Sequence, residues 1–345
     1  MAASFERLER LGSGYFGEVW LARDTGLDAL RALKLIPKDR LINPTNFFHE
    51  AQVLKLAEHP NVVRVEETGT MADGSIYVAM EYLKSGSLED EAKGSYIPLT
   101  RVKRLVGDVL RGLDHAHHKG ILHRDIKPAN ILVGHAGDGK LSDFGLAVPL
   151  GIDPAKLGIK DYKYVLHLAP EVAAGHPNSV AADIYACGVT MYRLVNGDSF
   201  IAVPPGADIS DLAAAGKFPD RSHYREFVPK PWRTLINRAM NIDPSVRPGT
   251  AEELRHALEG MKACMSWYER ILTNGVRWTS AHDCRICELT RRQIGTDEWL
   301  VELKKGRSKS ALRRVGPMCS TVQTEALARR ASGRILQDYV LGRLH

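Results

Sequence analysis

A short stretch in the middle of the chain places an aspartate, a lysine and an asparagine close together, in the sequence His123-Arg124-Asp125-Ile126-Lys127-Pro128-Ala129-Asn130. Thirteen residues after Asn130 come Asp143, a phenylalanine and a glycine. The Asp125 carboxylate can accept a proton from a hydroxyl, Lys127 can reach a transferring phosphate, and Asn130 and Asp143 offer oxygen ligands suited to Mg²⁺. Phosphoryl transfer requires these parts: a positioned hydroxyl, metal-bound phosphates, and positive charge where negative charge develops.

Two features nearer the N-terminus could hold a nucleotide. From Gly12 to Val19 the chain reads Gly-Ser-Gly-Tyr-Phe-Gly-Glu-Val, and glycines at this spacing let backbone N–H groups approach a phosphate. Lys34 lies in an apolar strand pattern, where its charge needs a partner, and Glu50 on the next predicted helix is its natural one. Taken singly, the first feature also fits an ordinary turn between strands, and the second an ordinary surface ion pair.

The elements around these residues are predicted to be strands first and helices later. Residues 46–58 have apolar side chains at helical spacing, and an apolar stripe from Val102 to Leu113 predicts a long helix that reaches His117. The chain then reads as helical to about Gly260. This order predicts an α+β arrangement in two lobes. Strands are expected over residues 5–11, 18–23, 30–36, 62–67 and 75–82, with short strand pieces beside Asp125 and Asp143.

The ordered series of motifs resembles the eukaryotic-type (Hanks-type) protein kinase family, and the compact layout is similar to its bacterial members. The resemblance spans about residues 5–258 and includes Ala169-Pro170-Glu171 and Asp243-Pro244-Ser245-Val246-Arg247-Pro248. It implies a bilobal kinase domain over residues 1–260, with a β-rich N-lobe over about 1–82 and a helical C-lobe over about 83–260. A basic extension over 261–345 lies outside it. Lys127, in the form Asp-Ile-Lys-Pro-Ala-Asn, indicates the serine/threonine branch.

The resemblance also implies roles for individual residues. Asp125, Lys127 and the Lys34–Glu50 pair would be catalytic, and Asn130 and Asp143 would bind Mg²⁺. Asp183 would brace the catalytic loop, and Glu171 and Arg247 would form a buried ion pair. The implied reaction transfers the γ-phosphate of ATP to serine or threonine hydroxyls of protein substrates, the chain itself included. The ATP site would be formed by Gly12, Gly14, Gly17, Val19, Ala32, Lys34, Met80, Glu81, Leu83 and Leu132.

The segment between Asp143 and Glu171 departs from the family pattern because it contains no serine or threonine. Many relatives activate by phosphorylating such a residue, whose phosphate then pairs with the arginine before the catalytic aspartate. We therefore expect activation by packing, by a partner, or by modification of Tyr162 or Tyr164. Tyr164 also occupies the position of a threonine that usually contacts the catalytic aspartate, which leaves substrate choice open.

The composition indicates the class of protein and the compartment in which it works. Hydrophobic residues make up 44% of the 345 residues and charged residues 26%, as in ordinary globular proteins. We expect a cytoplasmic protein without a membrane segment, because no long apolar run is present and the charged N-terminus does not resemble a signal peptide. Five cysteines are too few and too unevenly spread for a disulfide framework, so reduced thiols are expected.

The last quarter of the chain carries all of the excess positive charge. Residues 261–345 hold 16 Lys/Arg and 8 Asp/Glu, while the preceding residues hold 31 and 33. Such asymmetry favours an acidic partner or nucleic acid for this segment, although the basic run over residues 304–309 also fits a solvated face, and packing against the kinase domain stays open. Three tryptophans predict a folded segment, with a strand over 298–304 and a helix over 324–344. Cys284 and Cys287 supply two of the four ligands that zinc prefers, and also fit a small reduced core.

Three competing functions are distinguishable from an active protein kinase. A nucleotide-binding pseudokinase would generally lack the equivalents of Lys34, Asp125 or Asp143, and all three are present. A small-molecule kinase would typically lack the Ala-Pro-Glu segment and the helices after it. A kinase recruited to nucleic acid by its tail would be recognised by salt-dependent binding to DNA or RNA.

Overall fold

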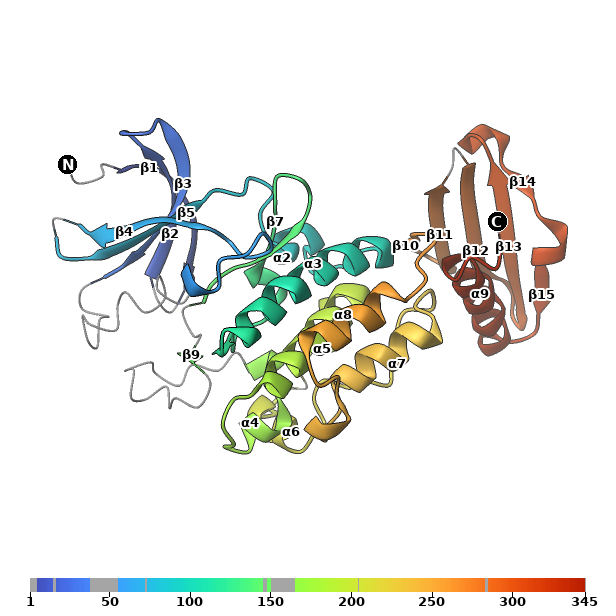
Figure 1. The fold of residues 1–345 in the computed structure, drawn as a ribbon. Coiled ribbons are helices and arrows are strands. Elements are labelled where there is room, and N and C mark those ends of the chain that lie inside the picture. The colour runs from blue at the N-terminus through green and yellow to red at the C-terminus, as the bar shows by residue number, and fades with distance from the viewer. Residues whose placement is uncertain are drawn as a thin grey trace.

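The computed structural model describes residues 5–14, 17–37, 55–71, 73–144, 148–149, 165–203, 205–282 and 285–344. Three parts succeed one another in Figure 1: an N-terminal sheet, a helical lobe and a C-terminal sheet with one helix. The first two form the bilobal α+β arrangement that the sequence predicts. Within the described residues, no helix combines the length and apolar character needed to cross a membrane.

The N-terminal sheet has five antiparallel strands in the order β1-β2-β3-β5-β4. Alternating side chains place Ala22, Leu33, Tyr77 and Ala79 in a small core on one face, which is the usual result of a period-two pattern. The strands are β1 (Phe5–Gly14), β2 (Gly17–Asp24), β3 (Ala29–Ile36), β4 (Val65–Thr70) and β5 (Ile76–Glu81).

The strand predicted over residues 62–67 is displaced in the structure. β4 begins only at Val65, and of the two valines before it Val62 is buried in the core of the helical lobe while Val63 is buried beside β5. Val62 forms a parallel bridge with Leu141, and the Val63 N–H donates to the Leu141 carbonyl at 2.9 Å. This segment therefore joins the two lobes.

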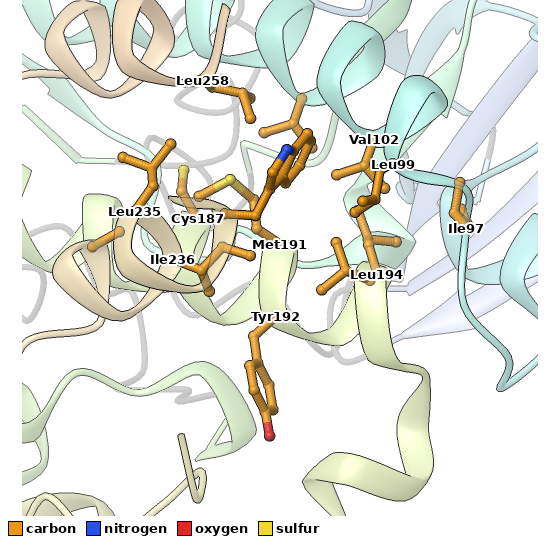
Figure 2. Packing of buried hydrophobic residues seen from close by; sticks show 14 of the residues in the cluster. Ile97, Leu99, Val102, Cys187, Met191, Tyr192, Leu194, Leu235, Ile236 and Leu258 are labelled. Carbon is orange, nitrogen blue, oxygen red and sulfur yellow. The ribbon is translucent and has the colours of Figure 1, made fainter. Parts of the chain in front are cut away.

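The helical lobe packs around α3 (Leu99–His118) and α5 (Val180–Asn196). The apolar stripe predicted on α3 is buried along its length, and Figure 2 shows Val102 and Leu99 close to Leu194 of α5. Burying such side chains stabilises the fold by about 1.5–3 kcal/mol each. The other helices are α2 (Leu88–Ala92), α4 (Pro170–Ala173), α6 (Ile209–Ala214), α7 (Lys230–Ala239) and α8 (Ala251–Glu259).

Two small β-ladders lie at the junction of the lobes. β6 (Ile121–Leu122) pairs with β9 (Val148–Pro149), and β7 (Ile131–Val133) pairs with β8 (Gly139–Leu141). The segment between β6 and β7 contains the motif around Asp125, and Asp143 comes two residues after β8. Both predicted catalytic segments are thus loops held by neighbouring strands.

Residues beyond α8 form a C-terminal unit, which we define as residues 261–344. Its six-stranded antiparallel sheet runs β10-β11-β12-β13-β14, with β15 also paired to β13, and α9 (Glu325–Val340) lies across one face of the sheet (Figure 1). β13 and α9 correspond to the strand and helix predicted there. The strands are β10 (Tyr268–Leu272), β11 (Gly275–His282), β12 (Arg285–Gly295), β13 (Glu298–Gly306), β14 (Arg313–Arg314) and β15 (Ser320–Val322).

The basic run over residues 304–309 does not form one positive surface. In strand β13, neighbouring side chains point to opposite faces of the sheet. Lys304 pairs with Glu302 at 2.9 Å on one face, while the Lys305 ammonium lies 4.7 Å from the centre of the Tyr339 ring of α9 on the other. Trp267 and Trp278 are buried in the core of this unit, as a folded segment requires.

Candidate active site

A buried carboxylate fixes the backbone of the loop that carries Asp125. Asp183, near the start of α5, accepts hydrogen bonds from the His123 and Arg124 backbone N–H groups, both at 2.9 Å. Arg124 has a φ of 70°, an unfavourable conformation for a residue with a side chain, and these two hydrogen bonds help to hold it. The predicted bracing role of Asp183 is confirmed.

Histidines that the sequence analysis did not single out complete this support. His117 on α3 hydrogen-bonds Asp183 at 2.9 Å through Nε2. Burial raises the pKa of Asp183, but the hydrogen bond and charge of His117, together with the interactions of His123, outweigh it and lower the pKa, so the carboxylate is ionised. Sequence spacing gave no signal for this contact, because the two residues lie on different helices.

His123 is neutral and has a defined tautomer. Burial lowers the pKa of its imidazole, although nearby carboxylates oppose that shift. Nε2 donates to the Ser142 carbonyl at 3.0 Å, and Nδ1 accepts from the Asp125 backbone N–H at 3.2 Å. The ring thus links the Asp125 loop to the segment that leads to Asp143.

Asp125, Lys127 and Asn130 meet at one point. The Lys127 Nζ lies 2.7 Å from Asp125 Oδ2, and the Asn130 Nδ2 donates to the same oxygen at 2.9 Å and to the Asp125 carbonyl at 2.8 Å. Because its amide nitrogen is engaged, Asn130 has its side-chain oxygen available for another group. The Asp125 carboxylate is therefore held in one position by two different side chains.

Lys34 reaches this site from the N-terminal sheet. Its Nζ, on β3, lies 2.9 Å from Asp143 Oδ1, which joins residues 109 positions apart in the sequence. Burial raises the pKa of Asp143, but the Lys34 ammonium outweighs that effect and holds the pKa below its usual range. Asp143 adopts a φ of 60°, so the backbone is strained where this carboxylate is presented.

The predicted ATP-site residues of the N-terminal sheet face the same region. Antiparallel pairing sets Val19 opposite Lys34 and Ala32 opposite Met80. Met80 and Leu83 are buried in one small cluster, against which Ala32 and Leu132 pack from β3 and β7. Apolar predicted residues from both lobes therefore approach one another near the lysine.

Among the glycines of the predicted nucleotide loop, Gly17 has a backbone conformation and surroundings that require glycine. Its φ is 138°, and a Cβ added there would lie 1.9 Å from the Leu35 carbonyl oxygen. Gly14 pairs with Gly17 where β1 and β2 meet, and Gly12 pairs with Val19.

The Glu81 side chain is engaged at the junction of the lobes. Its carboxylate accepts hydrogen bonds from the Arg64 backbone N–H and from the Lys140 ammonium, both at 2.9 Å. The Glu81 N–H donates to the Arg64 carbonyl at 3.0 Å, so the side chain and the N–H are both engaged within the protein.

The oxygen donors of Asn130 and Asp143 fit a hard divalent cation. Both are side-chain oxygens at the ends of adjacent short segments, linked through the Ser142 N–H, which donates to the Asn130 carbonyl at 2.9 Å. Such oxygens suit Mg²⁺, which keeps several waters and needs few protein ligands. Among the described residues there is no cluster of three or more His, Cys, Asp or Glu side chains that could hold a metal ion.

A family model for the protein kinase domain matches residues 5–258. This chain belongs to the protein kinase family. Among curated relatives, serine/threonine-protein kinase PknJ of Mycobacterium tuberculosis is 35% identical over 266 residues, which cover 73% of this chain and 44% of PknJ. PrkC of Bacillus subtilis, also a serine/threonine-protein kinase, is 30% identical over 260 residues, or 74% of this chain and 40% of PrkC.

Tyrosine kinases also appear among the relatives. Tyrosine-protein kinase MasK of Myxococcus xanthus is 30% identical over 278 residues, which cover 73% of this chain and 42% of MasK. The chain spans less than half the length of these three relatives. The kinase family uses ATP and a divalent metal, which agrees with the donors gathered around Lys34 and Asp125.

The predicted structural ion pair of the kinase C-lobe is confirmed. Arg247, whose side chain is fully buried, makes two parallel hydrogen bonds to Glu171, at 2.7 and 2.8 Å. Nearby, His167 is buried and accepts no proton at neutral pH, since burial lowers its pKa to about 3. Its Nδ1 donates to the Ile126 carbonyl at 2.9 Å and so ties the Ala-Pro-Glu segment to the catalytic loop.

Several predicted residues lie outside the described part of the kinase. They are Glu50, the glycine that comes after Asp143-Phe144, and the two tyrosines of the segment between Asp143 and Glu171. The same holds for Cys284, whereas Cys287 is buried in the sheet core and burial raises the pKa of its thiol.

Proposed function

We propose that this protein transfers the γ-phosphate of ATP to serine or threonine hydroxyls of protein substrates, itself included, with Mg²⁺ as the metal. The proposal is supported best by one observation: Lys127 Nζ lies 2.7 Å from the carboxylate of Asp125. This pair places a cation beside the group that would accept the hydroxyl proton. The lysine two residues after the aspartate also favours the serine/threonine branch.

In the proposed reaction each residue acts at a stated atom. Asp125 Oδ accepts the proton of the substrate hydroxyl. The hydroxyl oxygen forms a bond to the γ-phosphorus, and the bond between the γ-phosphorus and the β-phosphate oxygen breaks. Lys127 lies where it can stabilise the charge on the transferring group, and Lys34 orients the phosphates and Asp143. Mg²⁺, held by Asn130 and Asp143, would neutralise phosphate charge when bound.

The family match over residues 5–258 supports the proposed division of the chain. Residues 1–260 are the catalytic domain, with lobes meeting near residue 82, and residues 261–345 recruit an acidic partner. Glu50 pairs with Lys34 in the catalytic state. The nucleotide lies between Gly12, Gly14, Gly17, Val19 and Ala32 on one side and Met80, Glu81, Leu83 and Leu132 on the other.

Phosphorylation assays with radiolabelled ATP and Mg²⁺ test the function. Asp125→Ala should lower label transfer to the protein and to a generic substrate by roughly 10²–10⁴-fold. Nucleotide binding, measured by calorimetry, should be retained, and the exposed Asp211→Ala control should label as the wild type does. Phosphoamino acid analysis should find phosphoserine or phosphothreonine. Equal labelling of Asp125→Ala and wild type, or label on tyrosine alone, would contradict the proposal.

A further inference from the structure

The C-terminal unit is fixed to the helical lobe by specific contacts. The loop before α7 supplies Arg225, which forms an ion pair with Glu269 of β10 and lies 4.4 Å from the centre of the Tyr96 ring. The Tyr96 hydroxyl donates to the Trp267 carbonyl at 3.0 Å and accepts from the Glu269 N–H at 2.6 Å. These contacts orient the first strand of the C-terminal sheet against the kinase.

Only one face of the C-terminal sheet is covered within the described residues. α9 packs on the face that carries Trp278, Cys287, Leu289, Val301 and Leu303, all of them buried. Side chains at alternate positions point the other way, and they line an open hollow of about 450 Å³. We call this surface the open face.

Strand pairing sets the layout of the open face in cross-strand rows. One row runs Arg270, Arg277, Thr290, Glu302, and the rows beside it place Glu288 next to Lys304 and Arg314, and Arg292 next to Leu300. In these rows, five basic side chains share the face with two acidic ones. The excess of positive charge in the last quarter of the chain is concentrated in part on this face.

Arg270 and Arg277 stand directly opposite each other on β10 and β11, an arrangement that destabilises a sheet because like charges repel across the strands. Arg277 has a carboxylate neighbour, Glu288, at 3.7 Å. No carboxylate of the described residues lies within ion-pair distance of Arg270 or Arg292, which both line the hollow. An anion bound between Arg270 and Arg277 would remove the repulsion between them.

The open face suits an acidic polypeptide better than a nucleic acid. Glu288 and Glu302 interrupt the basic side chains, so a continuous phosphate backbone would meet repulsion in the centre of the face. Stacking of bases requires exposed aromatic rings, and Tyr268 at the edge is the one aromatic residue that the described strands present there. Carboxylates spaced along an extended peptide can reach the arginines and avoid the glutamates.

We propose that the open face docks an acidic segment of the kinase's protein substrates, through Arg270, Arg277 and Arg292. This inference rests on the proposed kinase function. Since the C-terminal unit is fixed to the helical lobe, a docked substrate would be held on the same molecule as the catalytic loop, at a raised local concentration. Docking of this kind lowers the KM of acidic substrates without changing the chemical step.

Binding is tested on the full chain by fluorescence anisotropy with a labelled oligoglutamate peptide. The variant Arg270→Gln/Arg292→Gln should weaken peptide binding by roughly tenfold or more, because two charge-assisted contacts are lost. The control Arg330→Gln/Arg334→Gln changes the net charge equally on the exposed side of α9 and should change affinity less than about twofold. The affinity of the wild type should fall as salt is raised.

Three results would overturn the docking proposal. The first is that the wild type does not bind oligoglutamate, and the second is that both double variants lose peptide affinity equally. The third is that the wild type binds labelled single-stranded oligothymidylate more tightly than oligoglutamate and that Arg270→Gln/Arg292→Gln abolishes this binding. A kinetic assay separates this proposal from the kinase function. With casein as an acidic substrate, the open-face variant should raise KM and keep kcat, whereas KM for histone should stay unchanged. Absence of phosphorylation with intact peptide binding would contradict the kinase function alone.

Discussion

Removing the carboxylate of Glu226 should loosen the C-terminal unit from the helical lobe. Glu226, in the loop before α7, accepts two hydrogen bonds from Arg291 of β12 at 2.6 Å and one from Ser332 of α9 at 3.0 Å. The Arg291 side chain is 3% exposed and Glu226 is 21% exposed. In Glu226→Ala the arginine would stay buried without its partner, and breaking such a pair costs about 3–5 kcal/mol.

Because Glu226 retains some contact with water, we expect the lower end of that range, about 3 kcal/mol. Hydrogen exchange of the α9 amides measured by mass spectrometry reports this local opening free energy. A cost of about 3 kcal/mol corresponds to exchange faster by roughly a hundredfold. Peptides from α3, whose apolar stripe is buried in the core of the helical lobe, should exchange as in the wild type.

Two further variants make the test specific. Glu325→Gln removes an exposed partner of Arg329 on the same helix and should cost less than about 0.5 kcal/mol. Replacing both members of the buried pair, in Glu226→Gln/Arg291→Met, should recover most of the lost protection, since no buried charge then lacks a partner. An exchange rate in Glu226→Ala within about twofold of the wild type would refute the reasoning.

Three other predictions concern the catalytic loop, the nucleotide loop and the buried thiol of α5. Asp183→Ala should lower phosphotransfer by roughly a hundredfold or more while ATP affinity changes little, because the catalytic loop loses two backbone hydrogen bonds; unchanged kcat would contradict the bracing role. Gly17→Ala should raise KM for ATP, since its Cβ would meet the Leu35 carbonyl, whereas Gly316→Ala, with open space around its Cα, should not. Burial raises the pKa of Cys187 well above its usual value, so at mildly alkaline pH iodoacetamide should label exposed Cys264 long before Cys187, as peptide mapping will show.

The catalytic loop was predictable because its residues lie within eight consecutive positions, and their types alone specify the chemistry. The contact of Lys34 with Asp143 was not predicted from the sequence. The two residues are 109 positions apart, and their contact depends on how the two lobes pack together. The family resemblance implied Glu50, not Asp143, as the partner of Lys34. The structure pairs Lys34 with Asp143, and the predicted partner Glu50 lies outside the described residues.

The C-terminal sheet shows where sequence patterns fail. Only β13 was predicted among its strands. β12 hides its period-two pattern, because Arg291 occupies an inward position that an apolar residue would normally fill. Its burial depends on Glu226, which lies in another part of the chain and cannot be recognised by spacing. From the sequence alone, a buried charged residue whose ion-pair partner is distant is predicted to lie on the surface.

The hydrogen bonds between residues 261–267 and the helical lobe limit where the chain can be cut into separate fragments. The indole of buried Trp232 donates to the Lys262 carbonyl at 2.9 Å, and Lys103 donates to the Met261 carbonyl at 2.7 Å. A fragment that ended at residue 258, where the family match ends, would leave these donors without acceptors. The helical lobe therefore depends on backbone carbonyls from the first residues of the C-terminal unit. Exchange of that unit between homologous proteins would have to carry the segment through Trp267.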